Sequence, residues 1–402
     1  MNFITEKERN TPISDKCDLL VAGGGIAGIS AALAAAREGA RVTLIEREYM
    51  LGGLATLGLI AIYLPLCDGV GRQVSFGIAE ELLRLSIHFG VDRDEDVPAM
   101  KAWLTDENID VEARKKYRYA AQYNPHTFAA ECEQLLTKHG VKIIYGTVAV
   151  DTNVDGGKIT HVMIENKSGR SAIEVKTVVD ATGDADICKL SGAKTALFDK
   201  KNMLANWYYY FKNGKVNLRL LGALDDPDDP EGSAQISERR FTGVDAVDTS
   251  EMMMLARADM LKDVTRQRKE NPECVPVCLP TIPQVRTTRR VIGKHVSNYG
   301  EEHKYTETSI GMVGDWRKRG PVFELPFEIL YGEEVKNLAV AGRCVSTDEE
   351  MAEVTRVIPS CAVTGQAAGT AAAMCDDFTT LDVKKLQEKL VANGAKLHET
   401  DL

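Results

Sequence analysis

The chain has 402 residues, of which 44% are hydrophobic and 27% are charged, and its formal net charge is −10. This composition is typical of a soluble globular protein with room for more than one domain, and the negative charge argues against nucleic acid as a partner. The charged first residues and the nine irregularly spaced cysteines lead us to expect no secretory signal, a cytoplasmic location, reduced thiols and no metal site.

The first elements alternate between strand and helix. Cys17–Ala22 is a short apolar run that predicts a buried strand, Ile26–Glu38 predicts an alanine-rich helix, and Arg41–Ile45 predicts a second strand. The uncharged stretch Leu19–Ala36 has the length of a membrane span. Its three consecutive glycines and the strand that follows favour a βαβ unit instead, so we expect no membrane span.

The next segments continue this pattern. A helix is expected at Thr127–Lys138 and a strand at Val141–Ile144. Two further strands, Lys158–Glu165 and Ala172–Val179, are joined by a polar turn at Asn166–Gly169.

From about residue 191 to residue 331 the pattern changes, and near residue 337 the earlier pattern resumes. The elements expected in the changed region are a solvated loop at Asp225–Gly232, an amphipathic helix at Glu251–Arg268, an edge strand at Leu279–Val285 and a strand at Val322–Leu325. The elements expected after it are a strand at Asn337–Ala341 and helices at Val363–Met374 and Leu381–Gly394.

Three glycines follow the first strand in the spacing of a dinucleotide-binding turn. Gly23 allows the tight turn, Gly25 lets the backbone approach a pyrophosphate, and Gly28 permits close packing of helix on strand. The pyrophosphate then lies at the positive end of the helix, and Glu46, after the second strand, can accept hydrogen bonds from a ribose. The complete strand–turn–helix–strand–acid context predicts dinucleotide binding.

Several segments in chain order carry a family resemblance. They are GGGIAG at 23–28, Glu46, LGGLAT at 51–56, DATGDAD at 180–186, VRTTRRVIGKHV at 285–296, NLAVAGRCVS at 337–346 and TGQAAGTAAA at 364–373. In these segments the chain resembles the FAD-dependent oxidoreductases of the glutathione-reductase structural class, and is most similar to the family known simply as FAD-dependent oxidoreductase. The segment YMLGGLATLGL lacks the close cysteine pair of a disulfide reductase.

The resemblance implies an α/β fold with a discontinuous Rossmann-like FAD-binding domain and an inserted α+β substrate or cap domain. The expected divisions are 1–85, 126–190 and 335–378 for the FAD-binding domain, 191–334 with help from 86–125 for the cap region, and 379–402 for a C-terminal helix.

The resemblance also implies FAD as the cofactor, with non-covalent attachment favoured. The cofactor-binding positions that it assigns are Gly23, Gly25, Gly28, Glu46, Arg47, Gly52, Gly53, Ala55, Thr56, Val148, Ala181, Thr182, Gly183, Gly342, Arg343, Gly365, Gln366 and Ala367. The location of the Arg343 guanidinium is left open. Small residues at Thr364–Ala367, early in their expected helix, predict unpaired N–H groups that face the flavin and stabilise negative charge on it. A tightly packed helix without a ligand is the alternative for this segment.

The middle of the chain supplies candidates for substrate contact. On a helix, Arg286, Arg289 and Arg290 share one face and can bind a carboxylate or phosphate. A salt-bridged surface is the alternative. His295 and Arg290 are candidates for catalysis.

Two cysteines and one aromatic run are further candidates. Cys67 and Cys361 lie near segments expected to approach the flavin. Either cysteine can form a covalent bond to the flavin or act as a redox thiol, although buried inert thiols are commoner. In Trp207–Tyr210 a strand sends alternate rings to opposite faces, where they cover the flavin or pack in the core.

These observations predict an oxidoreductase that transfers a hydride between flavin N5 and a small organic substrate, and the arginine cluster favours an anionic one. The electron acceptor or donor stays unidentified. The alternatives are a flavin monooxygenase, a thiazole-synthase-like nucleotide-binding protein without flavin, and a redox-sensing flavoprotein without turnover.

Overall fold

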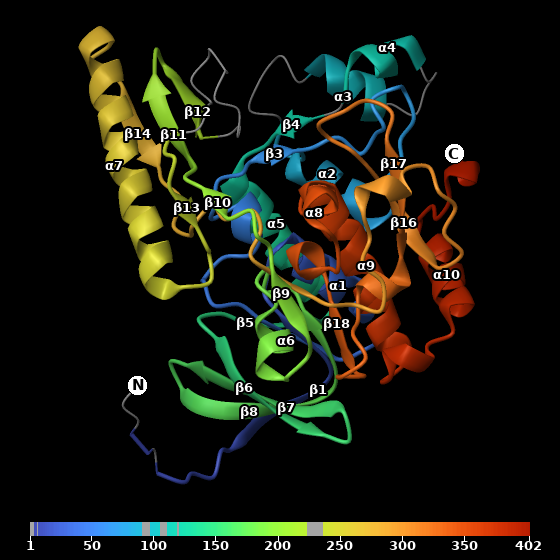
Figure 1. Cartoon of the computed structure of the whole chain (residues 1–402). Helices are drawn as coiled ribbons and strands as arrows, with labels where there is room; N and C mark the ends of the chain where they lie inside the picture. Colours follow the sequence, from blue (N-terminus) through green and yellow to red (C-terminus); the bar gives the residue numbers. More distant parts are fainter. Residues whose placement is uncertain (1–3, 6, 91–96, 105–110, 119, 223–235) are drawn as a thin grey trace.

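A seven-stranded sheet organises the fold, with strand order β5-β2-β1-β8-β7-β6 and with β18 also paired to β8 (Figure 1). This is a computed structural model, and it describes residues 4–5, 7–90, 97–104, 111–118, 120–222 and 236–402. The strands of the sheet are β1 (Ile13–Ala22), β2 (Val42–Ile45), β5 (Lys142–Ile144), β6 (Val148–Asp155), β7 (Lys158–Asn166), β8 (Gly169–Asp180) and β18 (Leu338–Val340). The neighbours β5, β2, β1 and β8 are parallel, as a βαβ unit requires.

Strand β8 has partners from three parts of the chain. One edge pairs in parallel with β1. The other edge pairs antiparallel with β7 over Gly169–Glu174 and parallel with β18 over Val178–Asp180. The end of β8, where the chain turns toward Thr182, is therefore flanked by β1 and β18.

Helix α1 (Ile26–Arg37) and helix α9 (Ile358–Met374) pack directly on each other next to the sheet (Figure 1). Side chains larger than hydrogen do not fit at two points of this contact. A Cβ atom on Gly365 would collide with the carbonyl oxygen of Ala27, and one on Gly369 with that of Ala31. The small residues of both helices thus permit a close approach of two backbones.

A second group of elements lies to one side of the sheet (Figure 1). Strands β11 (Asn206–Lys212), β12 (Lys215–Leu221) and β14 (Val275–Cys278) form a three-stranded sheet in the order β12-β11-β14. Helix α7 (Ala246–Glu270) packs on this sheet through Met260 and Val264, which contact Tyr208 and Leu221 in a small core.

The remaining elements connect or cover these two groups. The helices are α2 (Ile78–Ser86), α3 (Val97–Leu104), α4 (Val111–Lys116), α5 (Pro125–Lys138), α6 (Asp186–Leu190), α8 (Glu349–Thr355) and α10 (Val383–Ala392). The strands are β3 (Ile62–Tyr63), β4 (Ala121–Gln122), β9 (Thr195–Leu197), β10 (Asn202–Met203), β13 (Arg240–Phe241), β15 (Arg289–Val291), β16 (Ser309–Gly314) and β17 (Val322–Pro326).

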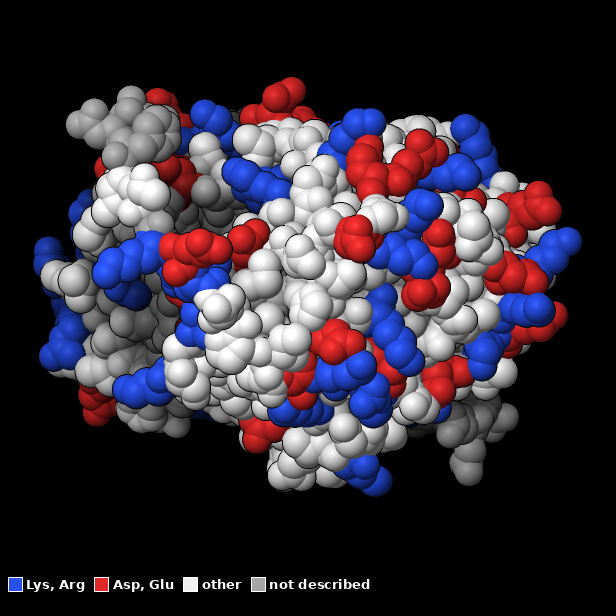
Figure 2. Space-filling view, turned by 90° about the horizontal axis from the view of Figure 1, so that it is seen from below, with Lys and Arg blue, Asp and Glu red and all other residues white. Residues whose placement is uncertain are grey.

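Charged side chains of both signs are interspersed over the face of the molecule in Figure 2. A deep hollow opens in this face, on the side where α7 lies in Figure 1. None of the described helices is long and apolar enough to cross a membrane.

The structure confirms the α/β fold and most of the expected elements, with two exceptions. The prediction of an edge strand at Leu279–Val285 is wrong. The strand β14 ends at Cys278, and the segment after it, which contains Pro280 and Pro283, has no regular structure. The helix expected from Val363 begins at Ile358, with Pro359 inside its first turn, where a proline is tolerated. The loop expected at Asp225–Gly232 lies outside the described residues.

Candidate functional site

An open cleft lies at the carboxyl ends of β1, β2 and β8, with an empty volume of about 1210 Å³ when its mouth is included. Dinucleotides bind at this edge of the sheet in doubly wound α/β folds. The polar groups that line it are Glu46, Arg47, Glu48, Thr147, Thr182, Asp186, Arg343 and Arg356. The other lining residues are Ala22, Gly23, Gly25, Ile26, Ala27, Ile45, Gly52, Gly53, Leu54, Ala55, Leu57, Val148, Ala149, Ala181, Gly183, Ile282, Pro283, Val285, Ala341, Gly342, Ile358 and Cys361.

The three glycines of the first turn have different surroundings. Gly23 has a φ of +101°, which favours glycine, and a Cβ atom there would meet the carbonyl oxygen of Ala181. A Cβ atom on Gly28 would collide with the carbonyl oxygen of Gly23, so Gly28 packs α1 against the turn and does not line the cleft. Gly25 has no atom within 4 Å of such a Cβ and faces the cleft.

The start of α1 fits an anionic ligand. Gly25 is its N-cap and offers no side-chain acceptor, so the first N–H groups of α1 are left for another acceptor. The 51–56 segment lies against this turn, since Gly52 N–H donates to the Gly24 carbonyl at 2.7 Å and Gly53 approaches Gly25. Two glycine segments thus form a bare backbone surface that suits a pyrophosphate.

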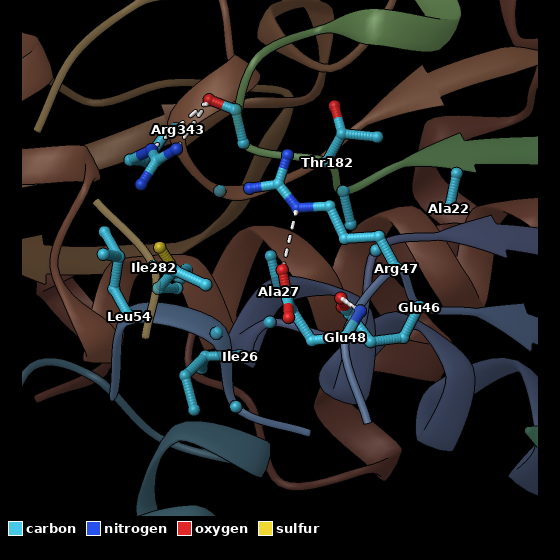
Figure 3. Close-up of a pocket in the computed structure, with 18 of the residues that line it drawn as sticks. Ala22, Ile26, Ala27, Glu46, Arg47, Glu48, Leu54, Thr182, Ile282 and Arg343 are labelled. Carbon is cyan, nitrogen blue, oxygen red and sulfur yellow. Dashed lines mark hydrogen bonds and ion pairs between the residues drawn. The ribbon is translucent and has the colours of Figure 1, made fainter. Parts of the chain in front are cut away.

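Glu46 lies at one end of the cleft, with Arg47 and Glu48 beside it (Figure 3). Its carboxylate accepts hydrogen bonds from the Gly24 N–H at 2.6 Å and from the Glu48 N–H at 2.8 Å. The side chain is buried, and this burial raises the pKa of Glu46 above its usual value. Glu46 therefore fixes the glycine turn, and its contact with a ribose stays a prediction.

Arg343 lies at the other end, near Ile282 and Leu54 (Figure 3). Its guanidinium donates to the Gly183 carbonyl, to the Val285 carbonyl at 3.1 Å and to Asp184 Oδ1 at 3.1 Å. The structure thus gives the position that the sequence left open. Arg343 joins three segments of the cleft wall that are far apart in the chain.

The same end of the cleft contains the start of α9. Ile358 and Cys361 line the cleft, and the N-cap Val357 supplies no side-chain acceptor. The prediction that unpaired N–H groups lie at Thr364–Ala367 is wrong, because those residues are in the interior of a helix that begins at Ile358. The free helix terminus exists, but about two turns earlier in the chain.

Several residues assigned to the cofactor lie outside the cleft. Gly365 packs on Ala27, Gln366 Oε1 accepts from the Ile78 N–H at 2.9 Å, and Ala367 is fully buried. Thr56 is also buried, and its hydroxyl donates to the Leu51 carbonyl at 2.5 Å. The other assigned positions apart from Gly28 line the cleft, and their contact with FAD stays a prediction.

The prediction that three arginines share one face of a helix is wrong. Arg286 precedes β15, and Arg289 and Arg290 are neighbours within this strand. Arg289 is buried and donates to Asp186 Oδ1 at 3.2 Å and to the Asp184 carbonyl. Arg290 lies over the Phe198 ring, and burial lowers its pKa. Arg286 donates to the Gly222 carbonyl. None of the three lines the cleft.

The remaining candidates are also placed by the structure. His295 lies outside the cleft, with Nε2 2.8 Å from Glu301 Oε1. Cys67 is buried away from the cleft, whereas Cys361 lines it. Burial raises the pKa of Cys361 to about 12, so the thiol is protonated at neutral pH.

The run 207–210 lies in β11 and does not line the cleft among the described residues. Tyr208 and Tyr210 share a face of the strand, with ring centroids 6.0 Å apart, as the alternation predicted. The Tyr208 hydroxyl donates to Asp263 of α7 at 2.7 Å. Packing is therefore the role that the described contacts give to these rings.

Sequence reasoning missed four further cleft residues with clear chemistry. Glu48 follows the predicted positions Glu46 and Arg47, Asp186 is the last residue of the DATGDAD segment but was assigned no role there, and Ile282 is in a segment that was predicted as a strand. Arg356 is two residues before α9, and a correct helix start would have placed it at a helix terminus. No spacing signal in the sequence brings these four together.

Known proteins show the following similarities. The family model described as FAD dependent oxidoreductase matches residues 18–275 and 296–390. A vinyl phenol reductase of Lactiplantibacillus plantarum is 28% identical over 188 residues, which are 42% of this chain and 38% of the reductase, so the match spans less than half of that relative.

Two solved structures are similar to this chain at low sequence identity. A geranylgeranyl bacteriochlorophyll reductase-like protein of Thermoplasma acidophilum has a TM-score of 0.47 and 13% identity, with coverage of 94% of this chain and 86% of that one. A flavocytochrome c3 fumarate reductase has a TM-score of 0.42 and 14% identity, with coverage of 90% and 79%. From the extent of the family match, the chain belongs to the FAD dependent oxidoreductase family.

Proposed function

We propose that this enzyme transfers a hydride between FAD and a small organic substrate that carries an acidic group. The observation that supports this proposal is the chemistry at the Arg343 end of the cleft, where Arg356 and the free N-terminus of α9 adjoin apolar residues. When bound, FAD supplies two-electron chemistry at its flavin ring. The residues of this end would hold the ring and the substrate.

Each group at this end has a physical task in the proposal. The unpaired N–H groups at the start of α9 favour negative charge, so they would stabilise charge that develops during reduction. Ile282, Pro283 and Ile358 are apolar and would exclude water. Since Ile282 and Pro283 come from the 191–334 region, that region would cover the reactive face. The protonated Cys361 thiol supports non-covalent attachment of FAD.

The proposal is tested by mixing the purified, oxidised enzyme with a panel of carboxylic acids and their neutral analogues without oxygen. Loss of the flavin absorption with an acid, followed by recovery with an electron acceptor, is the expected result. A second panel adds NADPH and oxygen, because product hydroxylation with NADPH consumption would instead indicate a monooxygenase. A protein that holds FAD but reacts in neither panel would contradict the proposal and favour a redox sensor.

Replacement of Arg356 by alanine is expected to lower kcat/KM for an acidic substrate by about 10- to 150-fold, as lost charged hydrogen bonds cost about 1.5–3 kcal/mol. Arg356 Nε and Nη2 both donate to Glu353 Oε2, which leaves Nη1 for a substrate anion. The side chain is 16% exposed. Steady-state kinetics with an acid and with its amide measure the effect.

The matched control is Arg84→Ala, since Arg84 also donates through Nε and Nη2 to one oxygen of a nearby glutamate, Glu80, but lies on α2 outside the cleft. This variant is expected to keep normal kinetics. An equal loss of activity toward the acid and its amide in Arg356→Ala would refute the anion contact.

A further inference from the structure

Helix α7 has apolar side chains on two opposite faces. Met252, Ala256, Met260 and Val264 are buried against the rest of the chain. On the other face Val247 is 77% exposed, Met254 62% and Leu261 59%. A helix that covers one side of a domain usually presents polar residues to solvent, so this second apolar face is unusual.

The exposed residues form a continuous stripe along the helix. Val247, Met254 and Leu261 are seven residues apart, and seven residues are only about 20° short of two full turns. The exposed Ala258 and Thr265 fall on the same side, four residues after Met254 and Leu261. At 25 residues α7 is about 37 Å long, and Figure 1 shows it at the outer edge of the molecule.

Charge is distributed unequally along this helix. Residues 246–256 contain Asp248 and Glu251 and no basic residue, and the N-cap is Asp245. Arg239 forms ion pairs with both Asp248 and Glu251. Asp245, Asp248, Glu251 and Arg239 together have a net charge of −2, so this half of the helix is negative. Residues 257–270 contain five basic and three acidic residues. An antiparallel copy of α7 would place each negative half against a positive one.

We infer that α7 is a dimer contact, in which the stripe packs antiparallel on the same stripe of a second copy of this chain. A twofold axis at Met254 places Val247 opposite the partner's Leu261, Ser250 opposite the partner's Ala258, and Glu251 opposite the partner's Arg257. Such a contact is self-complementary, as a twofold interface requires. The small Ser–Ala pairs allow the two helices to approach closely.

The first test measures the mass of the FAD-loaded enzyme in solution by light scattering. We expect twice the chain mass of 44.1 kDa, and a mass of one chain for Met254→Asp/Leu261→Asp. The control is Val391→Asp, which puts the same charge on an apolar residue that is 53% exposed on α10. This control is expected to stay dimeric. A wild-type enzyme of one chain mass at all concentrations would overturn the inference.

The second test examines the register. Met254→Cys is expected to form a disulfide between the two chains on mild oxidation, since a residue on the axis faces itself, whereas Val391→Cys is not. Seven of the nine native cysteines are buried and none is paired, so the background is low. A dimer without the Met254→Cys cross-link contradicts this interface. Sedimentation of a monomeric enzyme with phosphatidylglycerol vesicles, lost in the double aspartate variant, would show that the stripe binds lipid instead.

Discussion

Replacement of Gly28 by alanine is expected to lower the free energy of unfolding of the FAD-free protein by about 3 kcal/mol, whereas Gly25→Ala costs about 1 kcal/mol or less. The new Cβ on Gly28 would collide with the Gly23 carbonyl oxygen and force α1 away from the turn. At Gly25 the Cβ has no neighbour within 4 Å, and the φ of −69° suits alanine.

For FAD affinity we expect a clear loss in Gly25→Ala, which is the variant with the smaller loss of stability. The methyl group of Gly25→Ala would enter the cleft and raise the Kd for FAD by at least about tenfold, while the fold is kept. Guanidinium unfolding followed by circular dichroism gives the stabilities, and quenching of FAD fluorescence gives the Kd. Equal losses of stability in both variants, or unchanged FAD affinity in Gly25→Ala, would contradict this division of tasks.

Replacement of Arg343 by alanine is expected to lower both the stability of the protein and its retention of FAD. Arg343→Ala removes the links to Gly183, Val285 and Asp184, and it leaves the largely buried Asp184 carboxylate without its ionic partner. Breaking a buried pair from one side costs about 3–5 kcal/mol. We expect a loss of stability in this range and release of FAD, measured by thermal unfolding and by the flavin content of the purified protein.

Two further variants separate the causes. Arg343→Lys keeps the charge but loses the planar fork, so it is expected to recover only part of the stability. Arg37→Ala removes a two-bond arginine–glutamate pair whose side chains are 31% and 35% exposed, and it is expected to cost less than about 1 kcal/mol. If Arg343→Ala costs no more than Arg37→Ala, Arg343 does not hold the cleft wall together.

Local patterns in the sequence predicted the parts of the fold whose causes are local. The βαβ unit around Gly23–Gly28 has strong signals, because a buried strand, a tight glycine turn and an alanine-rich helix each depend on neighbouring residues. The end of the cleft at Glu46 follows directly from this unit. The same holds for the hairpin of β7 and β8, where the polar turn at 166–169 sets the register.

The Arg343 end could not be read in the same way, since its residues converge from separate segments. The sequence pattern 286–290 suits a helix as well as a strand, and pairing of β15 with β9 decides between them. Arg356 was missed because the start of α9 was placed after Pro359, although proline is tolerated in a first helical turn. Such tertiary choices leave little trace in the spacing of residues.

The shared edge of β8 also has a consequence for synthesis of the chain. When β8 has left the ribosome, Val178–Asp180 can pair with β1 on one edge only. The opposite edge has no partner yet, because β18 and α9 are among the last elements to be made. Pairings between distant segments are slow to form, and exposed strand edges attract other chains. The nascent protein therefore passes most of its translation with an incomplete cleft, and we expect truncation before Leu338 to yield an aggregation-prone chain.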